Sequence, residues 1–137
     1  MVSITVHFSY ISAERMSDKI PSEIQFQTQL SMPSGNIERV EGRLRVPFLF
    51  IMTTTPLVAS ITFKGYVVLD GKPDELEKIY QDIIQGSPPS YIFTATLHHT
   101  ITEAILISRE IGIPPPIPLP KFESKKQPTR GLTLETI

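Results

Sequence analysis

The chain has 137 residues, of which 40% are hydrophobic, and a formal net charge of -1. This length and composition fit one folded domain with a sizeable core, and the near-neutral charge gives no electrostatic reason to expect nucleic acid or an anionic membrane as a partner. The lack of cysteine excludes disulfides, thiolate nucleophiles and cysteine-based zinc sites.

The sequence also shows no sign of a membrane segment or a secretion signal. No apolar run approaches the roughly 20 residues that span a bilayer. Residues 1–10 alternate polar and apolar side chains instead of forming the apolar centre of a signal peptide. Because a cysteine-free chain suits a reducing compartment, we expect a cytoplasmic protein without membrane insertion.

Four stretches alternate apolar and polar residues with a period of two, which is typical of strands with one buried face. They cover residues 3–10, 24–32, about 39–54 and about 57–69. In the first stretch Tyr10 is expected on the same buried face as Phe8. Pro47 lacks an N–H group and indicates an edge position or a bulge, and Gly65 indicates a bulge or a close backbone approach. Short connections favour antiparallel pairing.

Two helices are expected after the strands, over about 73–85 and 89–111. Helical spacing in the second predicts one apolar stripe, which consists of Phe93, Leu97, Ile101, Ala104 and Ile111. Its apolar run 104–107 covers most of the helix circumference, which is more than one sheet can bury. Leu106 and Ile107 are therefore expected in an oligomer interface.

The expected architecture is an α+β fold, a four-stranded antiparallel sheet followed by two helices, in a single domain over residues 1–122. The proline-rich stretch 114–120 is expected to be extended. The polar tail 123–137 is expected to be flexible, although its apolar residues Leu132, Leu134 and Ile137 are able to dock on a neighbour.

The chain offers no convincing catalytic or metal-binding group. His99 and Glu103 are four residues apart and would share a helix face. His98 points about 100° away from His99, however, and no third ligand is near, so a polar surface pair is the favoured interpretation. No glycine-rich phosphate loop is present. We therefore expect no enzyme activity, no metal and no cofactor.

The second half of the chain carries a series of motifs that occur together in a known family. A strand ends at residues 63–65, and a short helix, Pro88-Pro89 and a long helix follow. The long helix closes with Gly112-Ile113, and a proline-rich stretch then runs to Phe122. This series resembles the SecB family of protein-export chaperones, over residues 61–122 in motif and 1–122 in element order. The resemblance implies four strands followed by two helices, a surface that binds unfolded polypeptide, and tetramers built as dimers of dimers. For this chain we expect a homo-oligomer, either a dimer or a tetramer.

Two features depart from the pattern of that family. Its aromatic, arginine-bearing stretch early in the second helix is replaced here by residues 93–99, and the acidic surface and C-terminal tail that contact the translocase motor have no counterpart in this sequence. The fold and the polypeptide-binding surface therefore carry over better than the export role.

Together, these observations predict a SecB-like oligomer that holds unfolded or extended polypeptides in an apolar groove. The groove is expected between the second helix, the connection of the second and third strands, and the proline-rich stretch. The candidate peptide-binding residues are Phe93, Leu97, Ile101, Ile105 and Ile113. The alternative is a structural or adaptor subunit that pairs with one specific protein partner and has no chaperone activity.

Overall fold

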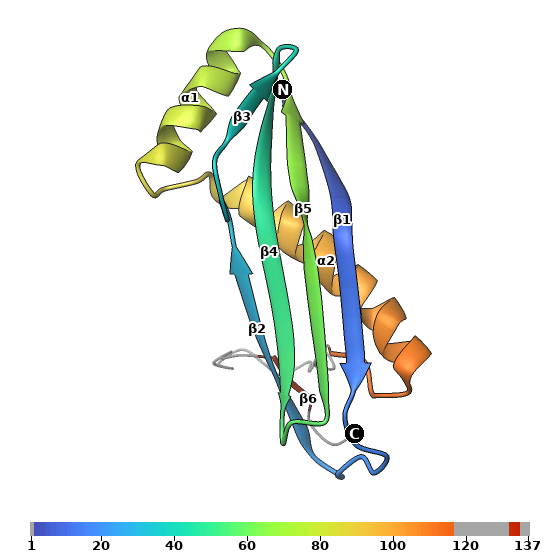
Figure 1. The fold of residues 1–137 in the computed structure, drawn as a ribbon. Helices are drawn as coiled ribbons and strands as arrows, with labels where there is room; N and C mark the ends of the chain where they lie inside the picture. Colours follow the sequence, from blue (N-terminus) through green and yellow to red (C-terminus); the bar gives the residue numbers. More distant parts are fainter. Residues whose placement is uncertain (1, 117–131, 135–137) are drawn as a thin grey trace.

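The computed structural model describes residues 2–116 and 132–134, and shows an antiparallel sheet with two helices on one face (Figure 1). The elements are β1 (Ser3–Arg15), β2 (Ile24–Ser31), β3 (Glu38–Val40), β4 (Arg43–Thr55), β5 (Ala59–Asp70), α1 (Pro73–Ile84), α2 (Ser90–Ile111) and β6 (Leu132–Leu134). The predicted α+β class, an antiparallel sheet followed by two helices, is confirmed. Neither helix of the described part is long and apolar enough to cross a membrane.

The strands lie in the order β1-β5-β4-β2-β6, with the short β3 also beside β4. β4 and β5 form the centre of the sheet, β1 forms one edge, and β6 lies beside β2 at the other. Of the tail that the sequence indicated as flexible, only the three residues of β6 are described. The rest of that tail, and the end of the proline-rich stretch from residue 117, lie outside the described residues.

The third predicted strand is in fact two strands joined by a tight turn. β3 ends at Val40 and β4 begins at Arg43, and the two residues between them, Glu41 and Gly42, have φ angles of 51° and 78°. Positive φ at both central residues is the geometry of a two-residue hairpin. The prediction of one strand over about 39–54 is therefore wrong, because a glutamate at the first turn position is not a typical hairpin residue.

Pro47 lies on the central strand β4 at a place where that strand is locally an edge. β2 pairs with β4 only up to Leu49, and β3 pairs with it only as far as Arg45, so Pro47 falls in the gap between them. The Pro47 carbonyl accepts a hydrogen bond from the Ser34 N–H at 2.8 Å. Because no strand faces Pro47 on this side, its missing N–H costs no ladder hydrogen bond. The predicted edge position of Pro47 is therefore confirmed, although β4 as a whole is a central strand.

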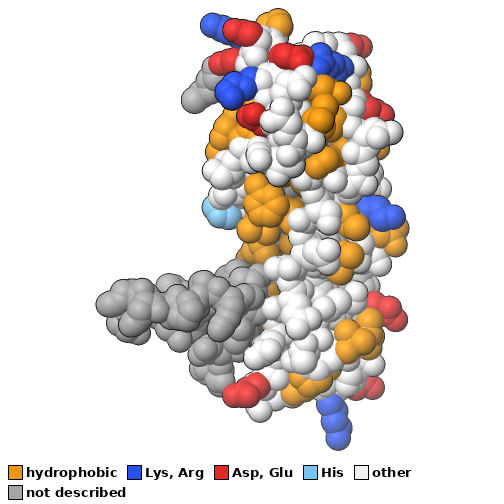
Figure 2. Space-filling model, turned by 90° about the vertical axis from the view of Figure 1, so that its left-hand side faces the viewer, with side chains coloured by type: hydrophobic (Ala, Val, Ile, Leu, Met, Phe, Trp, Pro, Cys, Tyr) orange, Lys and Arg blue, Asp and Glu red, His pale blue; other side chains and the backbone are white. Residues whose placement is uncertain are grey.

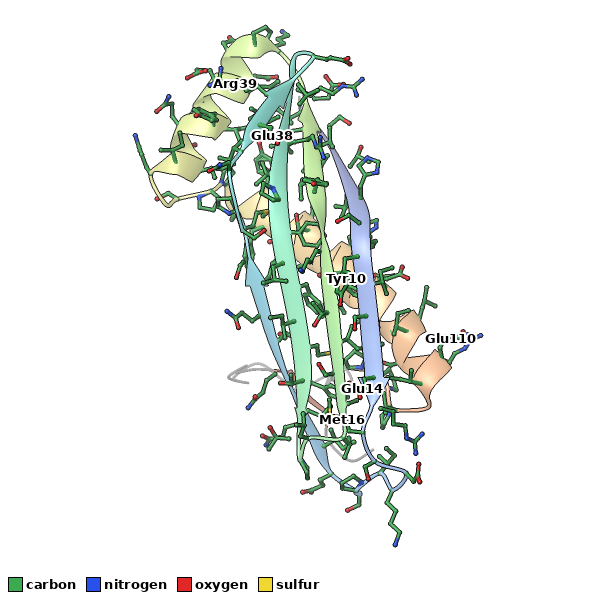
Figure 3. The ribbon with its side chains drawn as sticks, viewed as in Figure 1. Tyr10, Glu14, Met16, Glu38, Arg39 and Glu110 are labelled. Atoms are coloured by element: carbon green, nitrogen blue, oxygen red, sulfur yellow. The ribbon has the colours of Figure 1, made fainter. Side chains whose placement is uncertain are left out.

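A bulge in β1 lies opposite Gly65. The pairing register of β1 with β5 shifts between Phe8 and Tyr10, and a Cβ atom at Gly65 would collide with the β1 backbone. The extra residue moves Tyr10 to the uncovered face of the sheet (Figure 3), where it is 48% exposed and lies under the Lys64 Nζ. The predicted close approach at Gly65 is confirmed. The placement of Tyr10 on the buried face is wrong, because an inserted residue inverts the alternation of faces.

The core is an aromatic layer on the covered face of the sheet. The rings of Phe50 and Phe63 stack with their centroids 5.5 Å apart, and Phe8 lies 5.0 Å from Phe63 and 6.0 Å from Phe48. Aromatic pairs of this kind contribute about 0.5–1.5 kcal/mol beyond the area they bury. Both helices pack their buried side chains into the same core cluster.

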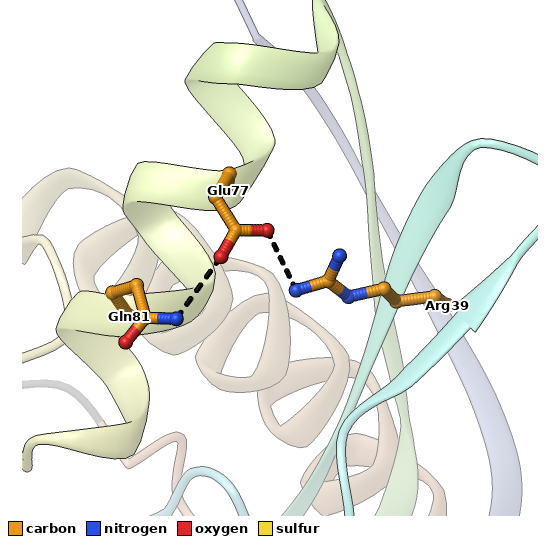
Figure 4. Close-up of polar contacts among 3 residues, drawn as sticks. All are labelled: Arg39, Glu77 and Gln81. Atoms are coloured by element: carbon orange, nitrogen blue, oxygen red, sulfur yellow. Dashed lines mark hydrogen bonds and ion pairs between the residues drawn. The ribbon is translucent and has the colours of Figure 1, made fainter.

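Helix α1 is attached to the end of the sheet at β3. Pro73 occupies its first turn, and the Lys72 N–H donates to the Glu75 carboxylate at 3.2 Å. Arg39 of β3 donates to Glu77 at 2.8 Å and Gln81 donates to the same carboxylate at 3.0 Å (Figure 4). The hydrogen bonds from Gln81 and Arg39 lower the pKa of the Glu77 carboxyl from its usual value. All of these groups are near solvent, so the pair contributes little to stability.

The C-terminal end of α2 is held at the end of β1. Gly112 ends the helix in the left-handed conformation, with φ at 75°. The Arg15 guanidinium donates hydrogen bonds to the carbonyl oxygens of Ile111 and Gly112, each at 3.2 Å. A cation is favourable here because these carbonyls have no partner within the helix. Figure 3 shows the same meeting point, with Glu14 and Met16 at the end of β1 and Glu110 on the last turn of α2.

Substituting Gly65 tests how closely β1 and β5 approach each other. Gly65→Ala should lower the free energy of unfolding by at least about 2 kcal/mol, because the new methyl group overlaps the β1 backbone. Gly35→Ala is the matched control, since its Cβ would lie 3.6 Å from the Pro47 ring in ordinary contact. Urea unfolding measures both variants, and equal stabilities would contradict the bulge.

Candidate functional site

Helix α2 is buried along a row of every fourth residue. This row, the buried ridge, consists of Ile92, Thr96, Thr100, Ala104 and Ser108, and the helix lies against β1 and β5. Residues at intervals of four form a row along the surface of a helix. Such a row stays in contact with a twisted sheet along the length of the helix that crosses it. Of the apolar stripe noted in the sequence, only Ala104 belongs to this buried ridge. Phe93 is exposed, and Leu97 and Ile101 are only partly buried.

The buried ridge consists mainly of small side chains. The hydroxyl of Thr96 donates to the Ile92 carbonyl and that of Thr100 to the Leu97 carbonyl, each at 2.9 Å, so both buried hydroxyls are satisfied. Ser108 Oγ is buried and has no hydrogen-bond partner among the described residues. Small residues let α2 lie close to the aromatic layer, which leaves its large apolar residues on other sides of the helix.

One side of α2, next to the buried ridge, is apolar along most of its length. This apolar flank consists of Phe93, Leu97, Ile101 and Ile105, which follow one another at intervals of four. Phe93 is 36% exposed, and the other three are partly buried. The structure thus brings four of the five predicted peptide-binding residues onto one flank. The fifth, Ile113, is 5% exposed and belongs to the core, so it lies off this accessible surface.

The apolar flank lies on the β2 side of the molecule. On the opposite flank of α2 the His99 ring is 5.5 Å from the Phe8 ring of β1. On the β2 side, Thr96 of the ridge contacts the sulfur of Met32, just beyond β2, at 3.8 Å. Figure 2 views the molecule from this side and shows hydrophobic side chains in the middle of the face, with charged side chains at its two ends.

Strand β2 offers an open edge on the same side. One edge of β2 pairs with β4 over residues 25–31, whereas β6 pairs with the other edge only at residues 24–26. Within the described part of the chain, nothing pairs with residues 27–31 on that second edge. An unpaired strand edge presents N–H and C=O groups that accept a further strand. This open edge and the apolar flank together form the candidate site.

The two predicted interface residues lie on different sides of α2. Leu106 is 49% exposed and lies opposite the buried ridge. Ile107 is partly buried and packs against the core. In a single chain, Leu106 therefore remains a large apolar side chain in water, whereas Ile107 is already covered in part.

The polar residues of α2 do not form a metal site. His98 is exposed and points away from the sheet, while His99 is next to Phe8 on the β1 side. Over residues 2–116 and 132–134, no group of three or more metal-ligating side chains comes together.

A separate cavity of about 530 Å³ lies between α1, the start of β1 and the start of α2. Its walls are mainly apolar, from Val2, Ile4, Ile79, Pro89 and Tyr91, and its rim carries Glu75, Lys78 and Asp82. Lys78 and Asp82 form an ion pair at 3.7 Å. This cavity is at the opposite end of α2 from Leu106 and does not include any member of the apolar flank.

Comparisons of the chain with protein-family models, with characterised proteins and with solved structures find no match. The candidate site is therefore argued from its own geometry.

The sequence did not single out the β2 edge, and it indicated only that apolar residues of the tail, Leu132 and Leu134 among them, are able to dock on a neighbour. The only signal is the alternation Leu132-Thr133-Leu134, and three residues are fewer than the four to eight that make a strand pattern recognisable. The buried ridge was missed for another reason, because hydroxyl and small residues carry no hydrophobic signal.

Leu106 provides a direct test of self-association. Leu106→Glu should leave the stability of the single chain within about 0.5 kcal/mol, because the side chain is half exposed there. If Leu106 is buried between copies, the same change should shift a dimer or tetramer toward the monomer, since an unpaired charge is costly in a dry interface. Light scattering at micromolar concentration measures the mass. Ile84→Glu, at an equally exposed position on α1, is the control, and a monomeric parent chain would contradict self-association.

Proposed function

We propose that this chain is a SecB-like holding protein that binds extended segments of unfolded polypeptides. The observation that carries the proposal is that the apolar flank of α2 faces the same side of the molecule as the edge of β2 that is open within the described residues. The resemblance of residues 61–122 to the SecB family, and the order of strands followed by helices, support the same interpretation.

The two halves of the site supply two kinds of binding energy. An extended segment that lies along residues 27–31 of β2 forms main-chain hydrogen bonds, which do not depend on the sequence of the segment. Apolar side chains of the segment that reach the apolar flank gain about 25 cal/mol for each Å² of apolar surface removed from water. Binding of this kind tolerates many sequences and requires no nucleotide.

We further propose that the protein assembles into dimers or tetramers through the side of α2 that carries Leu106. That side is opposite the buried ridge, whereas the apolar flank faces β2. Because the two surfaces are on different sides of the helix, burying Leu106 between copies leaves the flank reachable. A client that arrives after assembly needs such a surface.

The alternative function, an adaptor subunit for one specific partner, is supported by the partial burial of the flank. Phe93 is its only member that is more than a third exposed. A shallow surface of this kind also fits a permanent interface with one protein. The two functions differ in how many unrelated polypeptides the assembled protein binds.

A charged side chain on the apolar flank should weaken the binding of unfolded polypeptides. Phe93→Asp and Ile105→Asp change the two members that do not pack against the core, so folding should be retained. Each should weaken the binding of unfolded polypeptide at least about tenfold, because the carboxylate loses its water when a client binds. Thr94→Asp adds the same charge next to Phe93 on an exposed position and should change little.

The measurement is the aggregation of several unrelated, chemically unfolded proteins, without ATP. The parent chain should slow the aggregation of most of them, and added salt should have a modest effect because the net charge is only -1. If none is protected while one partner is captured at fixed stoichiometry, the adaptor function is correct. Equal protection by the parent and the Phe93→Asp chain would place the binding elsewhere.

A further inference from the structure

Strand β6 fills one end of the same edge that the proposed clients would use. It pairs antiparallel with β2, with Leu134 opposite Ile24, Thr133 opposite Gln25 and Leu132 opposite Phe26. β6 has three residues and β2 has eight. One edge of β2 is therefore occupied at its beginning and, within the described residues, open from Gln27 to Ser31.

We infer that β6 is the chain's own ligand for the β2 edge, and that an extended client binds by displacing it, starting from residues 27–31. This inference rests on the proposed function and adds three things to it. The client runs antiparallel to β2, its preferred sequence follows the pattern of β6, and a built-in competitor limits its affinity.

The lengths of the two strands explain how displacement works. A strand of three residues forms few main-chain hydrogen bonds, so its docking depends on its attachment to the same chain through residues 117–131. A client that first pairs with the open residues 27–31 then extends toward residue 24 and forms more hydrogen bonds than β6 does. A longer strand thus replaces a shorter, tethered one.

The register indicates which clients fit best. In β2 the side chains of Ile24 and Phe26 are buried in the core, whereas Gln25 between them is exposed. The β6 sequence places leucine opposite each buried residue and threonine opposite the exposed one. Residues that pair directly across antiparallel strands lie on the same face of the sheet. The edge therefore favours extended segments with apolar residues at every second position and without proline, which lacks the N–H group that pairing needs.

The open part of the edge brings such a segment to the apolar flank. Thr28 and Leu30 of β2 are only partly buried, unlike Ile24 and Phe26 beside β6. Met32, which follows, contacts Thr96 of α2. Apolar side chains of a client in this part would therefore lie on the face of the sheet that carries α2, where burial adds to the main-chain pairing.

The test compares three full-length chains: the parent, a chain with Leu132→Pro and Thr133→Pro, and a control with Glu135→Pro and Thr136→Pro. Proline has no N–H group, so two adjacent prolines remove the N–H that donates to β2 whether it belongs to residue 132 or to residue 133. The control places the same two prolines just beyond the strand. The probe is a fluorescein-labelled peptide with the sequence of residues 131–137, and its binding is measured by fluorescence polarisation. The same chains are assayed for slowing the aggregation of a reduced, carboxymethylated protein.

If β6 occupies the edge in about nine chains of ten, the β6 proline variant should bind the probe roughly tenfold more tightly than the parent and the control. In the parent chain, unlabelled peptide should compete with the unfolded protein, which tests the edge without any substitution. Equal probe affinity in all three chains, together with protection by the parent, would overturn the competition and leave the proposed function standing. Probe binding without protection of any unfolded protein would overturn both. A lower native mass of the β6 proline variant would show that β6 pairs with a second copy, which would also overturn competition within one chain.

Discussion

Helix α2 rests on the aromatic layer of the sheet through small side chains, mainly threonine, alanine and serine, with Ile92 at its start. Their size lets the helix backbone lie close to the rings of Phe8 and Phe63. The arrangement also decides what the rest of the helix does. Since the side nearest the sheet is taken by small residues, the large apolar residues are left on the flank that faces β2 and on the outward side.

The position of these large apolar residues, away from the sheet, connects the fold to the proposed function. A helix whose largest apolar residues faced the sheet would be fully satisfied within one chain. Here the apolar flank is only partly covered, and Leu106 is half exposed. The free energy of burying these groups remains available for binding to a client and to a second copy. Arg15 fixes the end of α2 to β1, so the flank keeps a defined position relative to the sheet.

The two edges of the sheet differ in the feature that limits their pairing with other chains. At the β1 edge, the bulge opposite Gly65 increases the local twist and turns Tyr10 to the uncovered face. At the β2 edge, β6 covers residues 24–26 of the strand. Exposed edges invite pairing with other chains. A short strand of the same chain blocks part of the β2 edge, and the remainder, which is unpaired within the described residues, lies on the same side of the molecule as the apolar flank.

The sequence by itself determined most of the elements, apart from the turn that separates β3 from β4 and the short β6, because strand and helix periodicities are local properties of the chain. The alternation along β4 and β5, the proline at the start of α1 and the glycine at the end of α2 were sufficient to predict the class of fold. It also placed Phe93, Leu97, Ile101 and Ile105 together, since an interval of four keeps residues on one side of a helix. It did not reveal that this side of α2 lies next to the contact with the sheet and not within it, because the angle at which α2 crosses the sheet depends on the twist of the strands beneath it. Only the tertiary structure decided that the buried ridge consists of small residues, that one inserted residue exposes Tyr10, and that Leu132–Leu134 returns to pair with β2. Each of these depends on contacts between residues far apart in the chain, which no local pattern specifies.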